Sequence, residues 1–329
     1  MKPLLVTMGD AVGIGPEIVA RAFRAGELAD AVVVGSVDVL RRAGAPMTAR
    51  IEAPADLAAV PPGCLPVIEP AGLPAGLATL PWGEVSAAAG AAAARCIEAA
   101  VALLQSGEGA ALVTAPVHKE ALAAAGLPWP GHTEMLQALA TPRGAPPPAV
   151  RMMLANPELR VVLVTIHVSL RRALEMLDFE AVLSTLRIAH AAAAAWGQPA
   201  PRIAVAGLNP HAGEGGLFGD EEIRFIAPAV QAARAEGIDA QGPFPPDTVF
   251  MRARRGAFDL VVAMTHDHGL IPVKYLGVEE GVNVTLGLPF VRTSPDHGTA
   301  FDIAGRGRAD AASLVAAARM ARRLADPGA

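Results

Sequence analysis

Three short apolar runs in this chain each lead into a histidine, and this pattern constrains the fold more than any other feature. The runs span residues 161–166, 203–208 and 260–265, and the histidines that follow them are His167, His211 and His266. Apolar runs of this length predict strands that are buried on both faces. Because ligands bind outside the carboxyl ends of the strands in an open α/β sheet, the three imidazoles predict a divalent-metal site with an open position for substrate.

Helical segments alternate with strand-like runs along the rest of the chain. Further strands are expected at 4–7, 31–36 and 111–116, with two extended segments in 282–294, and helices at 37–42, 86–104, 170–178, 179–196, 219–236 and 309–324. This alternation predicts an α/β fold with a largely parallel sheet. A Pro-rich connector at 141–150 is a candidate hinge between two domains.

Composition excludes several classes of protein. The chain has 329 residues, 52% of them hydrophobic, and a net charge of −5. Without a basic run, nucleic acid is not an expected partner. Cys64 and Cys96 match no metal or redox spacing, so we expect two inert thiols. The first residues do not resemble a signal peptide, and we expect no apolar run to reach the ~18 residues of a membrane span. We therefore expect a cytoplasmic protein.

Polar residues in the turns are candidates for binding and catalysis. The glycine loop at 9–17 lacks the G-x-G-x-x-G spacing, because Ile18 stands where the third glycine belongs, and no P-loop is present. His132 and Thr133 stand at a predicted helix start, where free N–H groups favour phosphate. Lys119, Lys274 and Arg292 lie among apolar and glycine residues, which also suggests anion binding. Asp267 and Asp247 are candidates for orienting the imidazoles, although Asp247 also suits a turn or an N-cap.

Several motifs together resemble the 4-hydroxythreonine-4-phosphate dehydrogenases of pyridoxal phosphate biosynthesis. They are GHTE at 131–134, NPHAGEGG at 209–216, PPDT at 245–248, HDHGLIPVKY at 266–275 and the run at 281–305. The resemblance extends from Gly9 to about Asp310. The first loop and HGTAFDIAG at 297–305 are also similar to the isocitrate and isopropylmalate dehydrogenases, which bind NAD(P) without the Rossmann fingerprint.

The resemblance implies two α/β/α domains, not of the Rossmann type, with the active site in a cleft between them. We expect residues 1–140 plus 275–329 in the first domain, and 141–274, with the metal histidines, in the second. It further implies a homodimer in which both subunits supply ligands.

The resemblance also implies the roles of the site residues. His167, His211 and His266 would bind one zinc, magnesium or cobalt ion, and the loop at 296–305 would bind NAD or NADP through His297, Gly298, Thr299 and Asp302. The expected substrate contacts are His132, Thr133, Lys274, Asn283 and Arg292. The expected catalytic residues are Lys274, Asp267 and Asp247, and the general base stays open among Lys274, Asp267 and a metal-bound water.

The chain departs from the family pattern at two places. Ala11 and Val12 replace Pro-Ala in the first loop, and Thr265 and His268 flank the His-Asp pair of the third histidine motif. His268 is therefore a candidate fourth ligand or an extra acid–base group.

The expected reaction is oxidation of 4-hydroxythreonine 4-phosphate to a 3-oxo acid that decarboxylates to 3-amino-2-oxopropyl phosphate. The alternatives are a phosphorylated four-carbon sugar acid or an aromatic dihydrodiol as substrate, a metal-dependent acyl or phosphoryl transferase, and a binding protein without catalysis.

Overall fold

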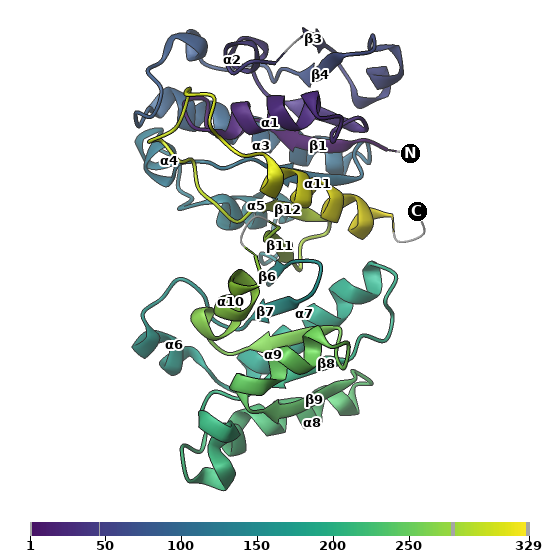
Figure 1. Cartoon of the computed structure of the whole chain (residues 1–329), viewed down its shortest axis with the longest axis vertical. Coiled ribbons are helices and arrows are strands. Elements are labelled where there is room, and N and C mark those ends of the chain that lie inside the picture. Colours follow the sequence, from purple (N-terminus) through teal and green to yellow (C-terminus); the bar gives the residue numbers. More distant parts are fainter. Residues whose placement is uncertain (1, 46, 278–279, 327–329) are drawn as a thin grey trace. The chain divides into compact units, whose positions relative to one another are not determined.

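The computed structural model describes residues 2–45, 47–277 and 280–326, which form two compact α/β units (Figure 1). Unit 1 comprises residues 2–148 and 288–326, and unit 2 comprises residues 149–287. The first boundary falls inside the expected hinge at 141–150. The second lies after residue 287 rather than 274, because the strand at 282–286 pairs with a strand of unit 2.

Unit 1 contains a six-stranded sheet in the order β3-β4-β2-β1-β5-β12, in which the registered neighbours run parallel. The strands are β1 (Leu4–Thr7), β2 (Ala31–Val34), β3 (Met47–Arg50), β4 (Cys64–Ile68), β5 (Ala111–Thr114) and β12 (Arg292–Pro295). The helices are α1 (Gly15–Arg24), α2 (Val37–Arg42), α3 (Ala87–Gln105), α4 (Lys119–Ala124), α5 (His132–Ala140) and α11 (Ala312–Ala325), with short 3₁₀ turns η1 (Pro54–Ala59) and η2 (Leu77–Thr79).

Unit 2 contains a mixed sheet in the order β11-β6-β7-β10-β8-β9, in which only β6 runs antiparallel to its two neighbours among the described pairs. Its strands are β6 (Arg151–Ala155), β7 (Arg160–Leu163), β8 (Ile203–Ala206), β9 (Ala240–Phe244), β10 (Leu260–Ala263) and β11 (Val282–Leu286). Its helical elements are α6 (Leu170–Met176), α7 (Phe179–Ala195), η3 (Pro210–Gly216), η4 (Glu222–Ile226), α8 (Ala227–Ala235), α9 (Pro246–Arg254) and α10 (His266–Tyr275).

The strands that the sequence predicts best are β1, β2, β5, β8 and β10, and all four residues of each are buried. Helices cover the sheets from outside, so every position of these strands is apolar or small. Strands β3, β4, β6 and β9 were not predicted. Both β3 and β9 are edge strands, and β9 carries Gly242 and Pro243, which weaken a strand signal.

Two further expectations need correction. The expected helices do not include residues 266–275, but this segment forms helix α10 with Pro272 in its interior. The proline removes one backbone hydrogen bond, and packing of the helix on the sheet compensates for that loss. Helix α3 is also long and apolar enough to cross a membrane by length and composition alone, with half of that stretch buried. It packs against β1, β5 and α4, as a core helix does.

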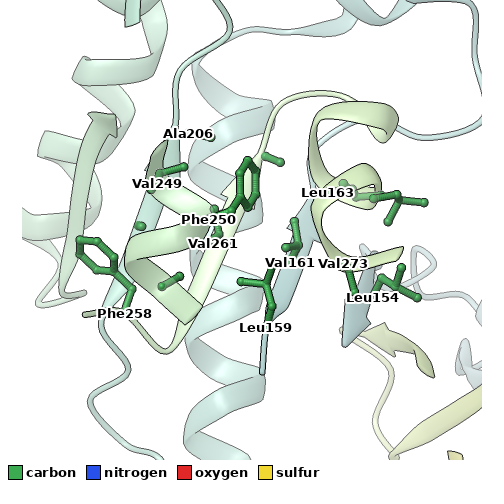
Figure 2. Close-up of a cluster of buried hydrophobic side chains, with 14 residues drawn as sticks. Leu154, Leu159, Val161, Leu163, Ala206, Val249, Phe250, Phe258, Val261 and Val273 are labelled. Carbon is green, nitrogen blue, oxygen red and sulfur yellow. The ribbon is translucent and has the colours of Figure 1, made fainter. Parts of the chain in front are cut away.

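A cluster of buried side chains holds α9 and α10 on the sheet of unit 2 (Figure 2). Val249 and Phe250 of α9, and Leu270 and Val273 of α10, pack on side chains of β6, β7, β8 and β10. Burying a side chain of this size contributes about 1.5–3 kcal/mol. Gly269 allows α10 to lie close to β7, because a Cβ there would be 2.9 Å from Val161 Cγ1. This close packing brings the first turn of α10 to the end of β7.

Candidate active site

Strands β7 and β10 are parallel neighbours, and each leads into one of the predicted histidines. Their pairing continues past the strands, because the Thr165 N–H and hydroxyl both donate to the Met264 carbonyl, at 3.2 and 2.8 Å. The two chain segments therefore leave the sheet side by side. This pairing places His167 beside His266.

The rings of His167 and His266 lie 5.5 Å apart between centroids, at an interplanar angle of 47°. A tetrahedral ion with metal–nitrogen bonds of about 2.0–2.1 Å holds two imidazole centroids roughly 5 Å apart. His167 has a left-handed backbone with φ of 50°, a conformation that is uncommon outside glycine and often marks functional sites. The pair therefore fits two ligands of one cation.

His266 is oriented by its neighbour. Its Nδ1 lies 2.7 Å from Oδ1 of Asp267, which leaves Nε2 for a metal ion. His268 lines the same pocket, of about 260 Å³, together with Thr165 and Thr265. The Nδ1 atom of His268 is buried and has no hydrogen-bond partner among the described residues. An unpartnered buried imidazole nitrogen next to two imidazoles fits a site for a soft or borderline cation.

His211 lies apart from this pair. It is exposed on η3, 5.9 Å from the ring of Phe218, and does not line the histidine pocket. Within the described parts of the chain, no group of three or more His, Cys, Asp or Glu side chains is arranged to hold a metal ion. The structure of one chain therefore brings two of the three predicted ligands together.

The predicted acidic and basic partners of unit 2 lie on the same group of elements. Asp247 is in the first turn of α9, and it lines a pocket of about 560 Å³ that also includes Asp267 and His268. Lys274 lies in the last turn of α10 and is half-buried. Asn283 lies on β11, opposite Leu154 of β6.

The predicted anion contacts of unit 1 are His132, Thr133 and Arg292, and Arg292 reaches Thr114 at the carboxyl end of β5. His132 is the first residue of α5, with Thr133 next to it. Burial, followed by the charge of Arg292, lowers the pKa of His132 to about 3, although a hydrogen bond to the Ala115 carbonyl opposes this shift. Its Nε2 is buried without a partner among the described residues. The imidazole is therefore neutral at physiological pH.

Arg292 supplies the positive charge at this place. It is 3% exposed, and its guanidinium donates to the hydroxyl of Thr114 from Nε at 3.2 Å and from Nη2 at 2.6 Å. Burial lowers its pKa to about 10, so it stays charged at neutral pH. A buried guanidinium beside a neutral imidazole and a helix N-terminus favours a bound phosphate or carboxylate.

The predicted cofactor loop packs on the first glycine loop. The Ile14 N–H donates to the Thr299 carbonyl at 3.0 Å, and a Cβ on Gly13 would lie 3.0 Å from Thr299 Cβ. His297 Nε2 is buried without a described partner, and its Nδ1 lies 3.0 Å from the Gly298 carbonyl. Asp302 is exposed.

Two residues near this loop were missed by sequence reasoning. Asp10 is fully buried, and burial raises its pKa, although the Val12 N–H at 3.0 Å and His118 oppose the shift. His118 stacks on Phe301 with 4.4 Å between ring centroids. The available signal was their position, because Asp10 and His118 come within three residues after the strand-like runs at 4–7 and 111–116.

The model of the family "Pyridoxal phosphate biosynthetic protein PdxA" matches residues 27–321. The chain belongs to the PdxA family. It is 57% identical to 4-hydroxythreonine-4-phosphate dehydrogenase of Beijerinckia indica over 99% of this chain and 96% of the relative. It is 47% identical to D-threonate 4-phosphate dehydrogenase of Pectobacterium atrosepticum over 98% and 99% of the two chains.

The fold agrees with this membership. The crystal structure of 4-hydroxythreonine-4-phosphate dehydrogenase from Klebsiella pneumoniae superposes with a TM-score of 0.90 at 47% identity, covering 98% of each chain. The chain is thus a PdxA-type dehydrogenase, an oxidoreductase that acts on a CH–OH group. The expected kinship with isocitrate and isopropylmalate dehydrogenases stays a prediction.

Proposed function

We propose that this enzyme oxidises 4-hydroxythreonine 4-phosphate with NAD or NADP, in a reaction that depends on one divalent metal ion. The 3-oxo acid product then loses CO2 to give 3-amino-2-oxopropyl phosphate, in pyridoxal 5′-phosphate biosynthesis. The His167–His266 pair, with rings 5.5 Å apart, is the observation that carries the metal dependence. The 57% identical relative of that name supports the choice of substrate.

The buried cluster of unit 1 is proposed to bind the substrate phosphate. Arg292 contributes charge, His132 a neutral imidazole, and Thr133 a hydroxyl and an N–H at the start of α5. Lys274 and Asn283 are proposed to contact the polar head of the substrate. Anchoring the phosphate in this way would fix the position of the reacting alcohol.

The histidines are proposed to hold zinc, magnesium or cobalt, which supplies Lewis acidity to the substrate hydroxyl when bound. The nicotinamide, proposed to lie at His297, Gly298, Thr299 and Asp302, supplies the hydride acceptor. Asp267 keeps His266 in one orientation through its 2.7 Å contact. The proposed general bases for the hydroxyl proton are Lys274 and Asp267, both on α10, or a water molecule at the metal site. Asp247 on α9 is the third proposed catalytic residue, and its role is to keep the site ordered. Asp267 lines the histidine pocket, and Asp247 lines the neighbouring pocket that shares Asp267 and His268.

We propose that the enzyme is a homodimer with shared active sites, in the cytoplasm. Unit 2 exposes large apolar side chains around the histidine pocket, including Leu170 at 65%, Ile271 at 65% and Tyr275 at 90%. Exposed apolar residues next to a site are typical of an interface. Leu217, which follows η3, the element that carries His211, is also 74% exposed. A second subunit would cover these residues and would allow His211 of one chain to complete the site of the other.

The relative named D-threonate 4-phosphate dehydrogenase supports a second substrate. This second substrate, D-threonate 4-phosphate, carries a hydroxyl where 4-hydroxythreonine 4-phosphate carries an amine. We expect the purified enzyme, stripped of metal and reloaded with zinc, magnesium or cobalt, to reduce NAD or NADP with the amino substrate at the higher kcat/KM. A higher value for D-threonate 4-phosphate would reassign the substrate, and no reduced nicotinamide with either would reject the proposal.

A further inference from the structure

Glu222, the second residue of the pair Glu221–Glu222, is a buried acid without a role in the proposed reaction. It is 3% exposed. Its Oε1 accepts the backbone N–H of Leu208 at 2.7 Å and of Asn209 at 2.8 Å, and its Oε2 accepts from the Asn209 side-chain amide at 2.9 Å. A buried carboxylate with three donors fixes all of them in place, because charged hydrogen bonds are short and strong.

The segment that Glu222 holds leads directly into the His211 loop. Residues 211–215 all have left-handed φ, from 44° to 80°, and three of them are not glycine, namely His211, Ala212 and Glu214. A run of this kind is strained, and it persists only where the surroundings determine it. Glu222 and Glu221 both accept hydrogen bonds from the residues just before this run, Leu208 and Asn209.

The packing around Glu222 leaves little room for other arrangements. A Cβ on Gly207 would lie 2.9 Å from Glu222 Oε1, and a Cβ on Gly213 would lie 2.8 Å from its Oε2. The carboxylate thus sits between the strand end that precedes the loop and the loop itself. Glu221 adds one hydrogen bond, from Asn209 Nδ2 to its Oε2 at 2.7 Å, and this bond lowers the pKa of Glu221.

We propose that Glu222 is a positioning residue that holds the His211 loop in its strained conformation before a metal ion binds. This inference rests on the proposed function, because it assigns His211 to the metal. The benefit is preorganisation: the ligand loses little freedom on binding when its loop is already ordered. Glu221 acts on Asn209 alone and therefore has the smaller effect.

The test compares Glu222→Gln with Glu221→Gln, its matched neighbour, and with His211→Ala, in the full chain. Glu222→Gln replaces an acceptor oxygen by an NH₂ group that faces the Asn209 amide. We expect about a tenfold to hundredfold weaker cobalt or zinc affinity, as for other residues that orient metal ligands, and a smaller loss for Glu221→Gln. In the metal-free protein, the imidazole NMR signals of His211 should shift and broaden in Glu222→Gln.

Melting of the metal-free proteins separates positioning from simple destabilisation, and Glu222→Asp serves if the glutamine variant does not fold. Weaker metal binding by both His211→Ala and the folded Glu222 variant supports the proposal. Weaker binding by His211→Ala with wild-type affinity and unshifted His211 signals in the Glu222 variant overturns this inference and leaves the proposed function intact. Wild-type affinity in His211→Ala overturns the metal assignment of His211 and this inference with it.

Discussion

Arg292 and Thr114 are joined by two hydrogen bonds to a single hydroxyl, from Nε at 3.2 Å and from Nη2 at 2.6 Å. Thr114 ends β5 and Arg292 begins β12, and the two strands are parallel neighbours. The threonine hydroxyl thereby holds a buried guanidinium in one orientation at the proposed phosphate site.

The variant Thr114→Val should disturb that orientation without changing the size of the side chain. Loss of a hydrogen-bond acceptor for a buried charged group costs about 1.5–3 kcal/mol of stability. We expect a higher KM for the phosphorylated substrate and an unchanged Kd for NAD. Thr293→Val is the control, because Thr293 is equally buried but donates to the Ala317 carbonyl. An equal rise of KM in both variants would argue against a role for Thr114 in phosphate binding.

His132 should make the stability of the protein depend on acid pH. Its pKa is about 3 in the folded protein, against about 6.5 in an unfolded chain, so the unfolded state gains the proton first. The contribution is therefore fully present above pH 6.5, and it is lost as the pH falls from there towards 3.

Between pH 7 and pH 5 this group alone should lower the free energy of unfolding by about 2 kcal/mol. Urea titrations at the two pH values measure the loss. His132→Asn retains a donor for the Ala115 carbonyl but does not titrate, so its loss should be smaller by that amount. Parallel pH curves for the two proteins would show that His132 is already charged or exposed.

Asp267→Asn should weaken metal binding by about tenfold, because the contact that orients His266 loses its charge. Asp267 is 81% exposed, so the melting temperature of the metal-free protein should not change. Competition with a coloured chelator measures the affinity. Asp38→Asn removes a carboxylate of similar exposure, 78%, from α2 in unit 1 and should bind metal as the wild type does. Equal affinities for both variants would remove Asp267 from the site.

His167→Ala and His266→Ala should not have additive effects on metal affinity. If both rings bind one ion, the second substitution costs less once the first has destroyed the site. Isothermal titration of the two single variants and the double variant with zinc gives the coupling. His190→Ala, on helix α7, is the control. Strictly additive losses would mean that the two histidines bind separate ions or none.

Ile271→Glu should shift the protein from dimer to monomer, because it places a charge among exposed apolar side chains of α10. Light scattering after size-exclusion chromatography measures the mass. If His211 of the partner subunit completes the site, the monomer should also bind metal more weakly. Val85→Glu, at 46% exposure in unit 1, is the control. A monomeric wild type with full activity would contradict the shared site.

Much of the secondary structure could be predicted from local pattern. Strands such as β2 and β10 are four consecutive buried apolar residues, and the expected helix at 86–104 is α3, whose N-cap Ser86 accepts the Ala89 N–H at 3.4 Å. Edge strand β9 could not be predicted, because Gly242 and Pro243 carry turn signals that pairing with β8 overrides. The antiparallel direction of β6 in the sheet of unit 2 was not predicted either. Strand direction depends on which strands pair, and pairing joins residues that are far apart in the sequence.

By itself, the sequence determined that three apolar runs lead into histidines. It also showed candidate phosphate-binding residues elsewhere in the chain, His132, Thr133 and Arg292, because both features are properties of neighbouring residues. Only the tertiary structure decided which of them meet. Pairing of β7 with β10 brings His167 next to His266. His211 instead lies on the left-handed turn that follows the residues bonded to Glu222, away from the histidine pocket. The order of strands and the burial of Arg292 beside Thr114 arise from contacts between distant residues, which no local pattern encodes.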